Sequence, residues 1–326
     1  MSIYNRIDAF VSKHQLISPG QTIIVGLSGG PDSVYLLHYL LQKKEFYDAT
    51  IIAAHLNHEW RDSAQVDESF CIELCRKLDV PLVTKKMSEL NLDIKPSGSK
   101  EQDARHARRS FLEHLARFYN ADTIAVAHHA DDQIETFFIR LMRGAGLTGL
   151  AGMRPKNGKY IRPLLSISKK DIMTWLEEQN VSYVIDPTNE SFAYLRNRIR
   201  HKLIPLMHEI DDRFINSCKQ TLERLQDTEL FLAHLTKQAF SDIAVFDRTK
   251  KVYVVDKQKF MALEPVLRYR VLVDWLAAEK VHFPVTQAFF DEIIRFIGNS
   301  ENKPHSLHNR WKLIKTKSNM YIQSNQ

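Results

Sequence analysis

Residues 21–39 read QTIIVGLSGGPDSVYLLHY, and this stretch decides the fold. An apolar, β-branched run ends at Gly26, a glycine-containing turn follows, and apolar residues then recur at helical spacing from Val34 onward. The pattern predicts a strand, a turn and a helix. Glycines without a Cβ atom let the backbone approach a ligand closely, and the helix start directs free N–H groups at the turn. We therefore expect the turn to bind an anion, with phosphate as the expected ligand.

The turn differs from the commoner phosphate loops. No lysine follows the second glycine, as a Walker loop requires, and the spacing does not fit the dinucleotide fingerprint either. An ordinary strand-to-helix connection with acidic and hydroxyl caps is the plainer interpretation, but a cap does not need two adjacent glycines. The residues of the turn are Ser28, Gly29, Gly30, Pro31, Asp32 and Ser33.

This Ser-Gly-Gly-x-Asp-Ser segment resembles, without a gap, the pyrophosphate loop of the N-type ATP pyrophosphatases, the PP-loop superfamily. The resemblance implies that ATP is cleaved between its α and β phosphates. It also implies that the loop holds the departing pyrophosphate, with Mg²⁺ near Asp32.

The chain has 326 residues, which is long enough for two domains. Hydrophobic residues make up 44% of it and charged residues 26%, as is usual in soluble globular proteins. No apolar run approaches the roughly eighteen residues that span a bilayer, and the N-terminus lacks the pattern of a signal peptide. We expect a cytosolic (cytoplasmic) protein without a membrane partner. Three cysteines form neither a disulfide framework nor a metal quartet. A formal charge of +6 modestly favours a nucleic-acid partner.

Strand and helix patterns alternate through the first two thirds of the chain. This alternation predicts a doubly wound, Rossmann-like α/β fold with a mainly parallel five-stranded sheet, and the resemblance of the glycine turn implies that it is a PP-loop fold. A helical linker and a smaller α+β domain follow in the prediction. After the opening strand, the predicted strands are Ala49–His58, Val80–Thr84, Asp122–Ala127 and Tyr160–Leu165. The predicted domains are a catalytic domain at 1–210, a linker helix at 211–240 and a second domain at 241–326, to which the further resemblance described below assigns tRNA binding and substrate recognition.

Acidic residues after the fourth strand extend the site. The carboxyl ends of parallel strands share one edge of a sheet, so these acids are expected to face the glycine turn. Asp131 fits an ordinary helix cap. Asp132 and Glu135 lie on one face of the predicted helix, and two carboxylates near a polyphosphate call for a cation between them. We therefore predict an Mg²⁺ site at Asp32 and Asp132.

Basic residues gather at positions 196–202. A solvated helix start explains them as well as an RNA contact does, because Lys and Arg side chains are usually exposed. The residues are Arg196, Arg198, Arg200 and Lys202.

Further stretches resemble the tRNA(Ile)-lysidine synthase family, in the order that the family has them. One departure is Glu59-Trp60, where the family usually has Gly-Leu. The stretches are His55-Leu-Asn-His58 with Arg61, Glu101 through Arg108, His129 through Thr136, Arg140 through Gly146, Arg162-Pro-Leu164, Asp186-Pro-Thr-Asn189 and Arg196-Asn-Arg-Ile-Arg200.

The resemblance implies a two-step ligation. ATP adenylates O2 of the wobble cytidine of a CAU-anticodon tRNA(Ile) and pyrophosphate leaves; the ε-amine of free L-lysine then attacks C2 and expels AMP. In this scheme Asp32, Asp132 and Glu135 are catalytic, with Glu135 the partner of the lysine amine, and His55 and His129 join the loop in binding ATP. The candidates for tRNA and adenylate contacts are Arg105, Arg108, Arg162, Arg196, Arg198 and Arg200.

Two other functions stay open at this point. A PP-loop tRNA thiolase would activate a base in the same way, but would normally require cysteine pairs that the chain lacks. A tRNA-binding module with an inactive nucleotide site is the other alternative, and the intact acids speak against it. The oligomeric state is open, with a homodimer as one candidate.

Overall fold

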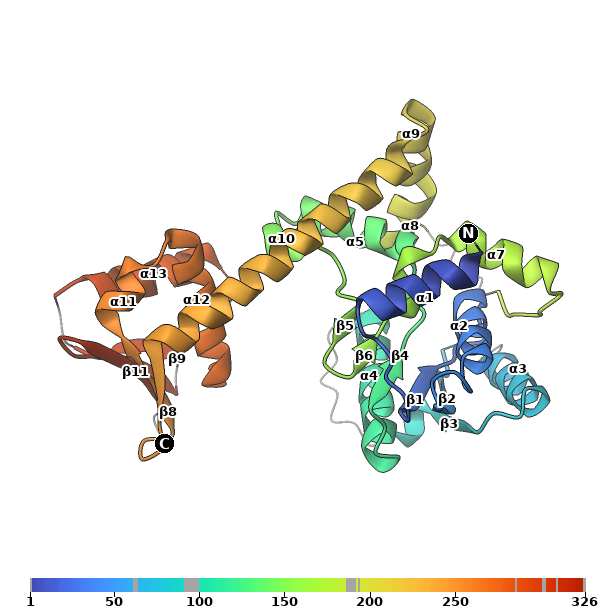
Figure 1. Cartoon of the computed structure of the whole chain (residues 1–326), viewed down its shortest axis with the longest axis horizontal. Coiled ribbons are helices and arrows are strands. Elements are labelled where there is room, and N and C mark those ends of the chain that lie inside the picture. Colours follow the sequence, from blue (N-terminus) through green and yellow to red (C-terminus); the bar gives the residue numbers. More distant parts are fainter. Residues whose placement is uncertain are drawn as a thin grey trace. The chain divides into compact units, whose positions relative to one another are not determined.

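The structure is a computed structural model that describes residues 2–60, 64–90, 100–185, 192, 194–284, 286–300, 303–308 and 310–324. The chain forms two compact units, Met1–Gln226 and Asp227–Gln326. Helix α10, Phe214–Ile243, begins in the first unit and ends in the second (Figure 1). The domain limits predicted at residues 210 and 240 stay a prediction. Arg61 and the segment 186–189, which contribute to the resemblance, lie outside the described residues.

The first unit is an α/β fold around a six-stranded sheet in the order β3-β2-β1-β4-β6-β5. All neighbouring strands are parallel except the terminal pair β5 and β6. Its elements are α1 Ile3–Lys13, β1 Thr22–Gly26, α2 Pro31–Gln42, β2 Thr50–Asn57, α3 Ala64–Lys77, β3 Leu82–Lys86, a 3₁₀ turn Met87–Glu89, α4 Lys100–Phe118, β4 Thr123–Ala125, α5 Ala130–Met142, α6 Leu147–Leu150, β5 Lys156–Asn157, β6 Tyr160–Ile161, a 3₁₀ turn Pro163–Ser166, α7 Lys169–Glu178, α8 Leu195–Arg198, a π-helical turn Ile199–Leu203 and α9 Ile204–Ile210.

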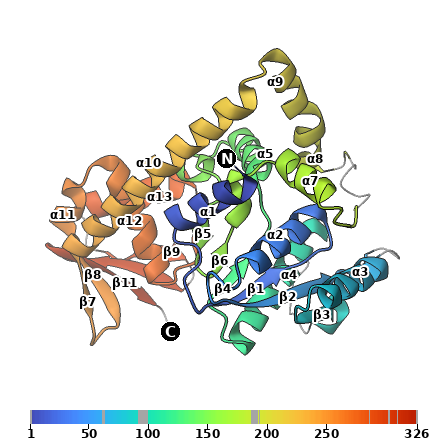
Figure 2. The same ribbon diagram turned by 45° about the vertical axis from the view of Figure 1, so that its right-hand side comes forward.

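Helices cover both faces of this sheet, which confirms the predicted doubly wound class. Side chains alternate along β1, so Ile23 and Val25 pack with α1, α2, α3 and α7, whereas Ile24 packs with α4. Figure 2 shows α7 beside α2, where the two helices are in contact. Burial on both faces explains why β1 and β2 read as nearly continuous apolar runs.

The predicted fifth strand is too long. Strand β6 covers only Tyr160–Ile161, because Pro163 offers no N–H to a ladder and begins a 3₁₀ turn instead. The two-residue strand β5 pairs with β6 and brings the sheet to six strands rather than five.

The second unit has helices packed against an antiparallel sheet in the order β7-β8-β11-β10-β9. Trp275, Phe260 and Phe290 are fully buried between helices and sheet. The short strands β7 and β9 and the separate helix α11 were not predicted. The elements are β7 Ala244–Asp247, β8 Val252–Asp256, α11 Lys257–Ala262, α12 Pro265–Ala278, α13 Gln287–Gly298, β9 His305–His308, β10 Trp311–Lys315 and β11 Asn319–Ser324. Within the described part of both units, no helix is long and apolar enough to cross a membrane.

Candidate active site

The site lies where the strand order changes direction. Strand β1 pairs with β2 on one side and with β4 on the other, and ligands of open α/β sheets bind beyond the strand ends at such a point. The turn after β1 leads into α2, and the segment after β4 leads into α5. Two helix starts therefore meet at this edge, and each directs backbone N–H groups and a positive dipole end toward it.

The glycine turn is held by its own hydroxyls. Ser33 Oγ accepts a hydrogen bond from the backbone N–H of Ser28 at 3.1 Å and donates one to the carbonyl of Gly30 at 2.9 Å. Gly29 has a φ of +82°, in the left-handed region that favours glycine. Pro31 is the first residue of α2, where its missing N–H costs nothing. The turn is thus shaped independently of any ligand.

Buried groups lie beneath the turn. Cys71 Sγ, on α3, would lie 3.3 Å from a Cβ added at Gly29, so a side chain there would crowd the cysteine. His55 Nδ1 lies 3.0 Å from the Leu27 carbonyl oxygen and 3.3 Å from Cys71 Sγ. Burial lowers the pKa of His55, which favours the neutral ring. His55, predicted to bind ATP, therefore contacts the base of the loop, and its direct contact with ATP stays a prediction.

His129 joins the two halves of the site. Its Nε2 lies 3.7 Å from Asp32 Oδ2 and 3.5 Å from Asp132 Oδ2, and its Nδ1 lies 3.4 Å from Asp131 Oδ2. Burial lowers the pKa of His129, but these carboxylates outweigh burial and raise it above the ordinary value. The positive form of the ring thus neutralises acids that face it from α2 and α5.

The donor set fits the predicted Mg²⁺. Asp32 and Asp132 offer carboxylate oxygens near the same histidine nitrogen, and Mg²⁺ commonly uses one or two carboxylates together with phosphate oxygens and water. Among the residues that the structure describes, no group of three or more His, Cys, Asp or Glu side chains could hold a metal by itself. A metal at this place would complete its coordination with oxygens from the nucleotide or from water.

Glu135 is fully buried and neutralised by arginines. Its two carboxylate oxygens accept hydrogen bonds from Arg200 Nε at 2.6 Å and Nη2 at 3.1 Å, and Arg196 Nε lies 3.2 Å away. Burial raises the pKa of Glu135, and the arginines reduce that rise. Arg200 also lies 3.6 Å from Asp132 Oδ1. Its position in the π-helical turn agrees with the frequent use of such turns at functional sites.

A second group of arginines surrounds His128. Burial, aided by the positive charges of Arg162, Arg196 and Arg105, lowers the pKa of His128 to about 4. Arg108 Nη2 lies 3.1 Å from His58 Nε2. Within the described part of the chain, no carboxylate forms an ion pair with Arg105, Arg108 or Arg162. Arginines without acidic partners are suited to bind an anion brought from outside.

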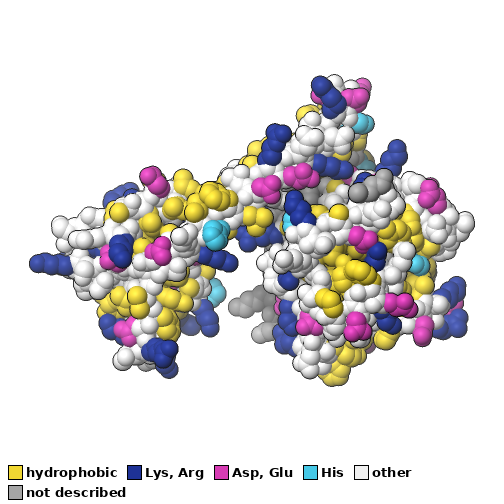
Figure 3. All heavy atoms as spheres, viewed as in Figure 1, with side chains coloured by type: hydrophobic (Ala, Val, Ile, Leu, Met, Phe, Trp, Pro, Cys, Tyr) yellow, Lys and Arg dark blue, Asp and Glu magenta, His cyan; other side chains and the backbone are white. Residues whose placement is uncertain are grey.

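The remaining predicted arginine, Arg198, is exposed and stands apart from these contacts. On the face shown in Figure 3, basic and acidic side chains are interspersed on both units. Surface charge on that face therefore does not mark an RNA-binding area by itself.

Lys169 belongs to the site and was not predicted. Its Nζ lies 2.6 Å from Asp32 Oδ1, and its backbone N–H donates to Asp131 Oδ2 at 2.6 Å. The sequence held one signal for it: Lys169 follows the helix cap Ser168, where the helix dipole favours acids over bases.

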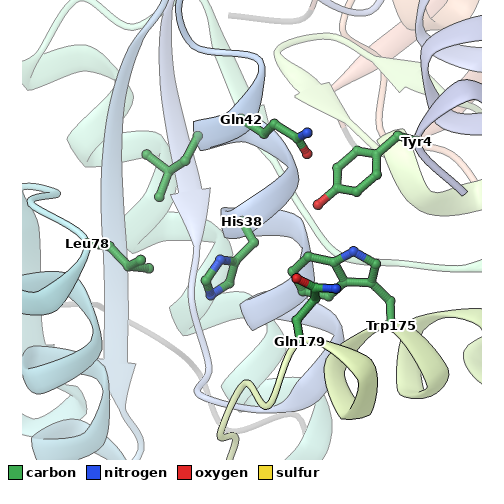
Figure 4. Close-up of a pocket in the computed structure, with 7 residues that line it drawn as sticks. Tyr4, His38, Gln42, Leu78, Trp175 and Gln179 are labelled. Carbon is green, nitrogen blue, oxygen red and sulfur yellow. The ribbon is translucent and has the colours of Figure 1, made fainter.

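A separate hollow of about 440 Å³ lies on helices α1, α2 and α7 (Figure 4). Tyr4, His38 and Trp175 line it, together with Leu41, Gln42, Leu78 and Gln179. It contains none of the predicted site residues, so it is not part of the candidate active site.

Comparison with known proteins identifies the family. A family model described as the PP-loop domain matches residues 2–207. The chain belongs to the PP-loop family. The glycine turn is accordingly its PP-loop, at the position after β1 that the sequence predicted.

Relatives of this PP-loop protein include tRNA(Ile)-lysidine synthases. That of Parabacteroides distasonis is 34% identical over 270 residues, covering 82% of this chain and 60% of the relative. That of Bacillus cereus is 30% identical over 304 residues, covering 91% of this chain and 64% of the relative. The chain thus spans less than two thirds of the length of these relatives.

A solved structure shares the fold. The U34-tRNA thiolase NcsA of Methanococcus maripaludis, with its [4Fe-4S] cluster, superposes with a TM-score of 0.58 at 17% identity. The match covers 69% of this chain and 78% of the thiolase chain.

Proposed function

We propose that this protein is a tRNA(Ile)-lysidine synthase, an ATP-dependent ligase that joins L-lysine to C2 of the wobble cytidine of a CAU-anticodon tRNA(Ile). The observation that carries the proposal is the pairing of a PP-loop after β1 with an acid-rich helix start after β4, joined through His129. The relatives of this chain that bear this name add support across 82 to 91% of its length.

The first step is adenylation. The cytidine O2 forms a bond to the α phosphorus of ATP while the bond from that phosphorus to the bridging oxygen breaks, and pyrophosphate leaves. The PP-loop and the start of α2 provide N–H groups for the leaving phosphates. Asp32 and Asp132 would hold Mg²⁺, which neutralises phosphate charge when bound.

The second step is attack by the lysine amine. Its nitrogen bonds to C2, the bond between C2 and the adenylated oxygen breaks, AMP leaves, and a proton is lost from the nitrogen. Glu135 is the proposed partner of this amine, in exchange for the Arg200 guanidinium that it holds. The burial that raises the pKa of Glu135 makes it a better proton acceptor than an exposed carboxylate.

The arginines around His128 and on α8 are proposed to contact the tRNA. Sequence-specific RNA recognition mostly targets single-stranded loops, and the wobble base lies in one. Arg105, Arg108 and Arg162 carry positive charge close to the site without an acidic partner in the described part of the chain. A tRNA-binding role for the second unit and a homodimer stay predictions.

Labelled lysine provides the decisive experiment. The protein is incubated with ATP, Mg²⁺, labelled L-lysine and a CAU-anticodon tRNA(Ile) transcript, and the label in RNA is counted alongside AMP and pyrophosphate. We expect lysine-dependent AMP and pyrophosphate release and one label per modified tRNA. Binding of the tRNA without entry of the label would contradict the proposal and favour a binding module; entry of sulfur from a sulfide donor would favour a thiolase.

A further inference from the structure

We propose that Lys169 is a phosphate-binding residue that neutralises the departing pyrophosphate. A Walker loop carries its own lysine for this purpose, and the turn Ser28–Ser33 has none. In this fold the missing charge comes from the start of α7, a segment 137 positions away along the chain from Asp32. The inference rests on the proposed cleavage of ATP between its α and β phosphates.

The ion pair between Lys169 and Asp32 is open to solvent. Nζ lies 2.6 Å from Asp32 Oδ1, and the side chains are 37% and 28% exposed. Ion pairs that water reaches contribute little to stability, so the ammonium group can leave Asp32 at small cost. It can therefore turn to a phosphate that enters the crevice.

The backbone of Lys169 is fixed at the start of α7, whereas its side chain is held by the solvent-accessible ion pair with Asp32. Its N–H donates to Asp131 Oδ2 at 2.6 Å, and the Ser168 cap accepts from the Asp171 N–H at 3.1 Å. A flexible stem of four carbons then extends from a fixed point beside the PP-loop. The lysine can follow a leaving group over several ångströms without any movement of α7.

Stability of α7 does not explain why a lysine stands here. The positive end of the helix dipole disfavours a cation in the first turn, and the contact with Asp32 offsets this. Binding of an anion would explain why a lysine stands at this unfavourable position beside the glycine turn.

The lysine and the acid have separate roles once nucleotide is bound. If Asp32 held Mg²⁺, Lys169 would lose its carboxylate partner and its ammonium group would be available to a phosphate oxygen. As the bond between the α phosphorus and the bridging oxygen breaks, negative charge grows on the pyrophosphate, and the ammonium group stabilises that charge. Lys169 thus serves the leaving group from its place on Asp32, whereas Arg200 forms its ion pairs with Glu135 and Asp132.

The test measures binding of inorganic pyrophosphate, ATP and AMP by calorimetry in the presence of Mg²⁺. The variants are Lys169→Met, Lys169→Arg and the matched control Lys170→Met, which changes the next, exposed lysine of α7. We expect Lys169→Met to weaken pyrophosphate and ATP binding by about tenfold or more and AMP binding by less than about twofold. The pyrophosphate affinity of Lys169→Arg should stay within about threefold of the wild-type affinity, because arginine keeps the positive charge. The affinity of Lys170→Met should equal that of the wild type.

Three results would overturn the inference: unchanged pyrophosphate binding in Lys169→Met, equal loss of pyrophosphate and AMP binding, or no binding of magnesium pyrophosphate by the wild type. Equal loss would mean that the ion pair only maintains the fold, which thermal melting of each variant checks independently. If pyrophosphate binding depends on Lys169 but no lysine enters tRNA, the inference stands and the proposed ligase function fails.

Discussion

Asp32 is the residue on which the phosphate chemistry depends most directly. It stands at the second position of α2, with Lys169 on one oxygen and His129 near the other. An amide in its place would keep the shape of the side chain but lose the charge that attracts a metal.

We expect Asp32→Asn to abolish pyrophosphate release while tRNA affinity changes by less than about threefold, because the proposed RNA contacts lie on other residues. Pyrophosphate release is followed in a coupled assay and tRNA binding by filter retention. Asp48→Asn, at an exposed turn position, is the control and should match wild type in both. Parallel loss of both properties would mean that Asp32 is needed for folding instead.

Glu135 forms ion pairs with two arginines, Arg196 and Arg200, inside the first unit. Its side chain is 1% exposed, whereas those of Arg196 and Arg200 are 24% and 35% exposed. We expect Glu135→Ala to lower the free energy of unfolding by about 2 kcal/mol, less than the 3–5 kcal/mol of a fully buried pair because water reaches the arginines.

A surface ion pair offers the matched control for this change. Glu113 lies 2.8 Å from Arg109, and the two side chains are 38% and 66% exposed. Glu113→Ala should therefore cost less than about 0.5 kcal/mol in the same urea titration. Equal effects of the two substitutions would contradict the role assigned to Glu135.

Among the elements, the PP-loop depends on one glycine conformation and on the helix beneath it. A side chain at Gly29 would be strained at a φ of +82° and would crowd Cys71 Sγ at 3.3 Å. Gly20 offers a comparison without crowding, because its φ is +77° and nothing lies within 4 Å of an added Cβ.

We expect both Gly→Ala variants to lose about 1 kcal/mol of stability from backbone strain, and only Gly29→Ala to lose pyrophosphate release. Thermal melting measures the first effect and the release assay the second. Full activity of Gly29→Ala would show that the loop tolerates displacement.

The stability of the start of α7 depends on pH through the charge of Asp171. This residue accepts from the Ser168 N–H and lies 2.9 Å from Arg6 Nη2. Burial raises the pKa of Asp171, but Arg6 and Ser168 outweigh burial and lower it below the ordinary value. A lowered pKa contributes stability that is present above the unfolded value of about 3.9 and is lost as pH falls through the folded value.

We therefore expect Asp171→Asn to lower the free energy of unfolding by about 1 kcal/mol at pH 7. The difference in unfolding free energy between variant and wild type should shrink as pH falls below about 4. Urea midpoints across this pH range provide the measurement, with Asp79→Asn in an exposed turn as the control. A gap that does not change with pH would rule out the charged form as the source of the effect.

On the scale of the whole molecule, the residues assigned to the site, from Ser28 to Arg200, all belong to the first unit. A net charge of +6 is modest, so the proposed tRNA affinity would depend on where the arginines stand. Arg198 is exposed, and it can meet a phosphate without giving up a buried contact.

We expect Arg198→Gln to weaken tRNA binding a few-fold and to reduce the slope of log affinity against log salt by about 0.7 to 0.9, the value for one lost phosphate contact. Lys77→Gln, an exposed change on α3, should leave that slope unaltered. An unchanged slope for Arg198→Gln would place the RNA elsewhere.

The sequence by itself determined the alternation of strands and helices in the first unit, the doubly wound class and the PP-loop, because each depends on local periodicity and on short spacings. It also indicated Asp32 and Asp132 as neighbours, since parallel strands bring their carboxyl ends to one edge. The length of β6 was predicted wrongly, because the apolar run continues past the proline and does not show where the edge strand ends.

Only the tertiary structure decided which side chains meet across that edge. Lys169 reaches Asp32 over 137 positions, Arg200 reaches Glu135 over 65, and Cys71 closes the space beneath Gly29. Such contacts depend on how distant helices pack and on the direction of each side chain, and neither follows from the spacing of residues along the chain. The PP-loop can be read in the sequence, but the charges that surround it come from segments that folding brings to the same edge.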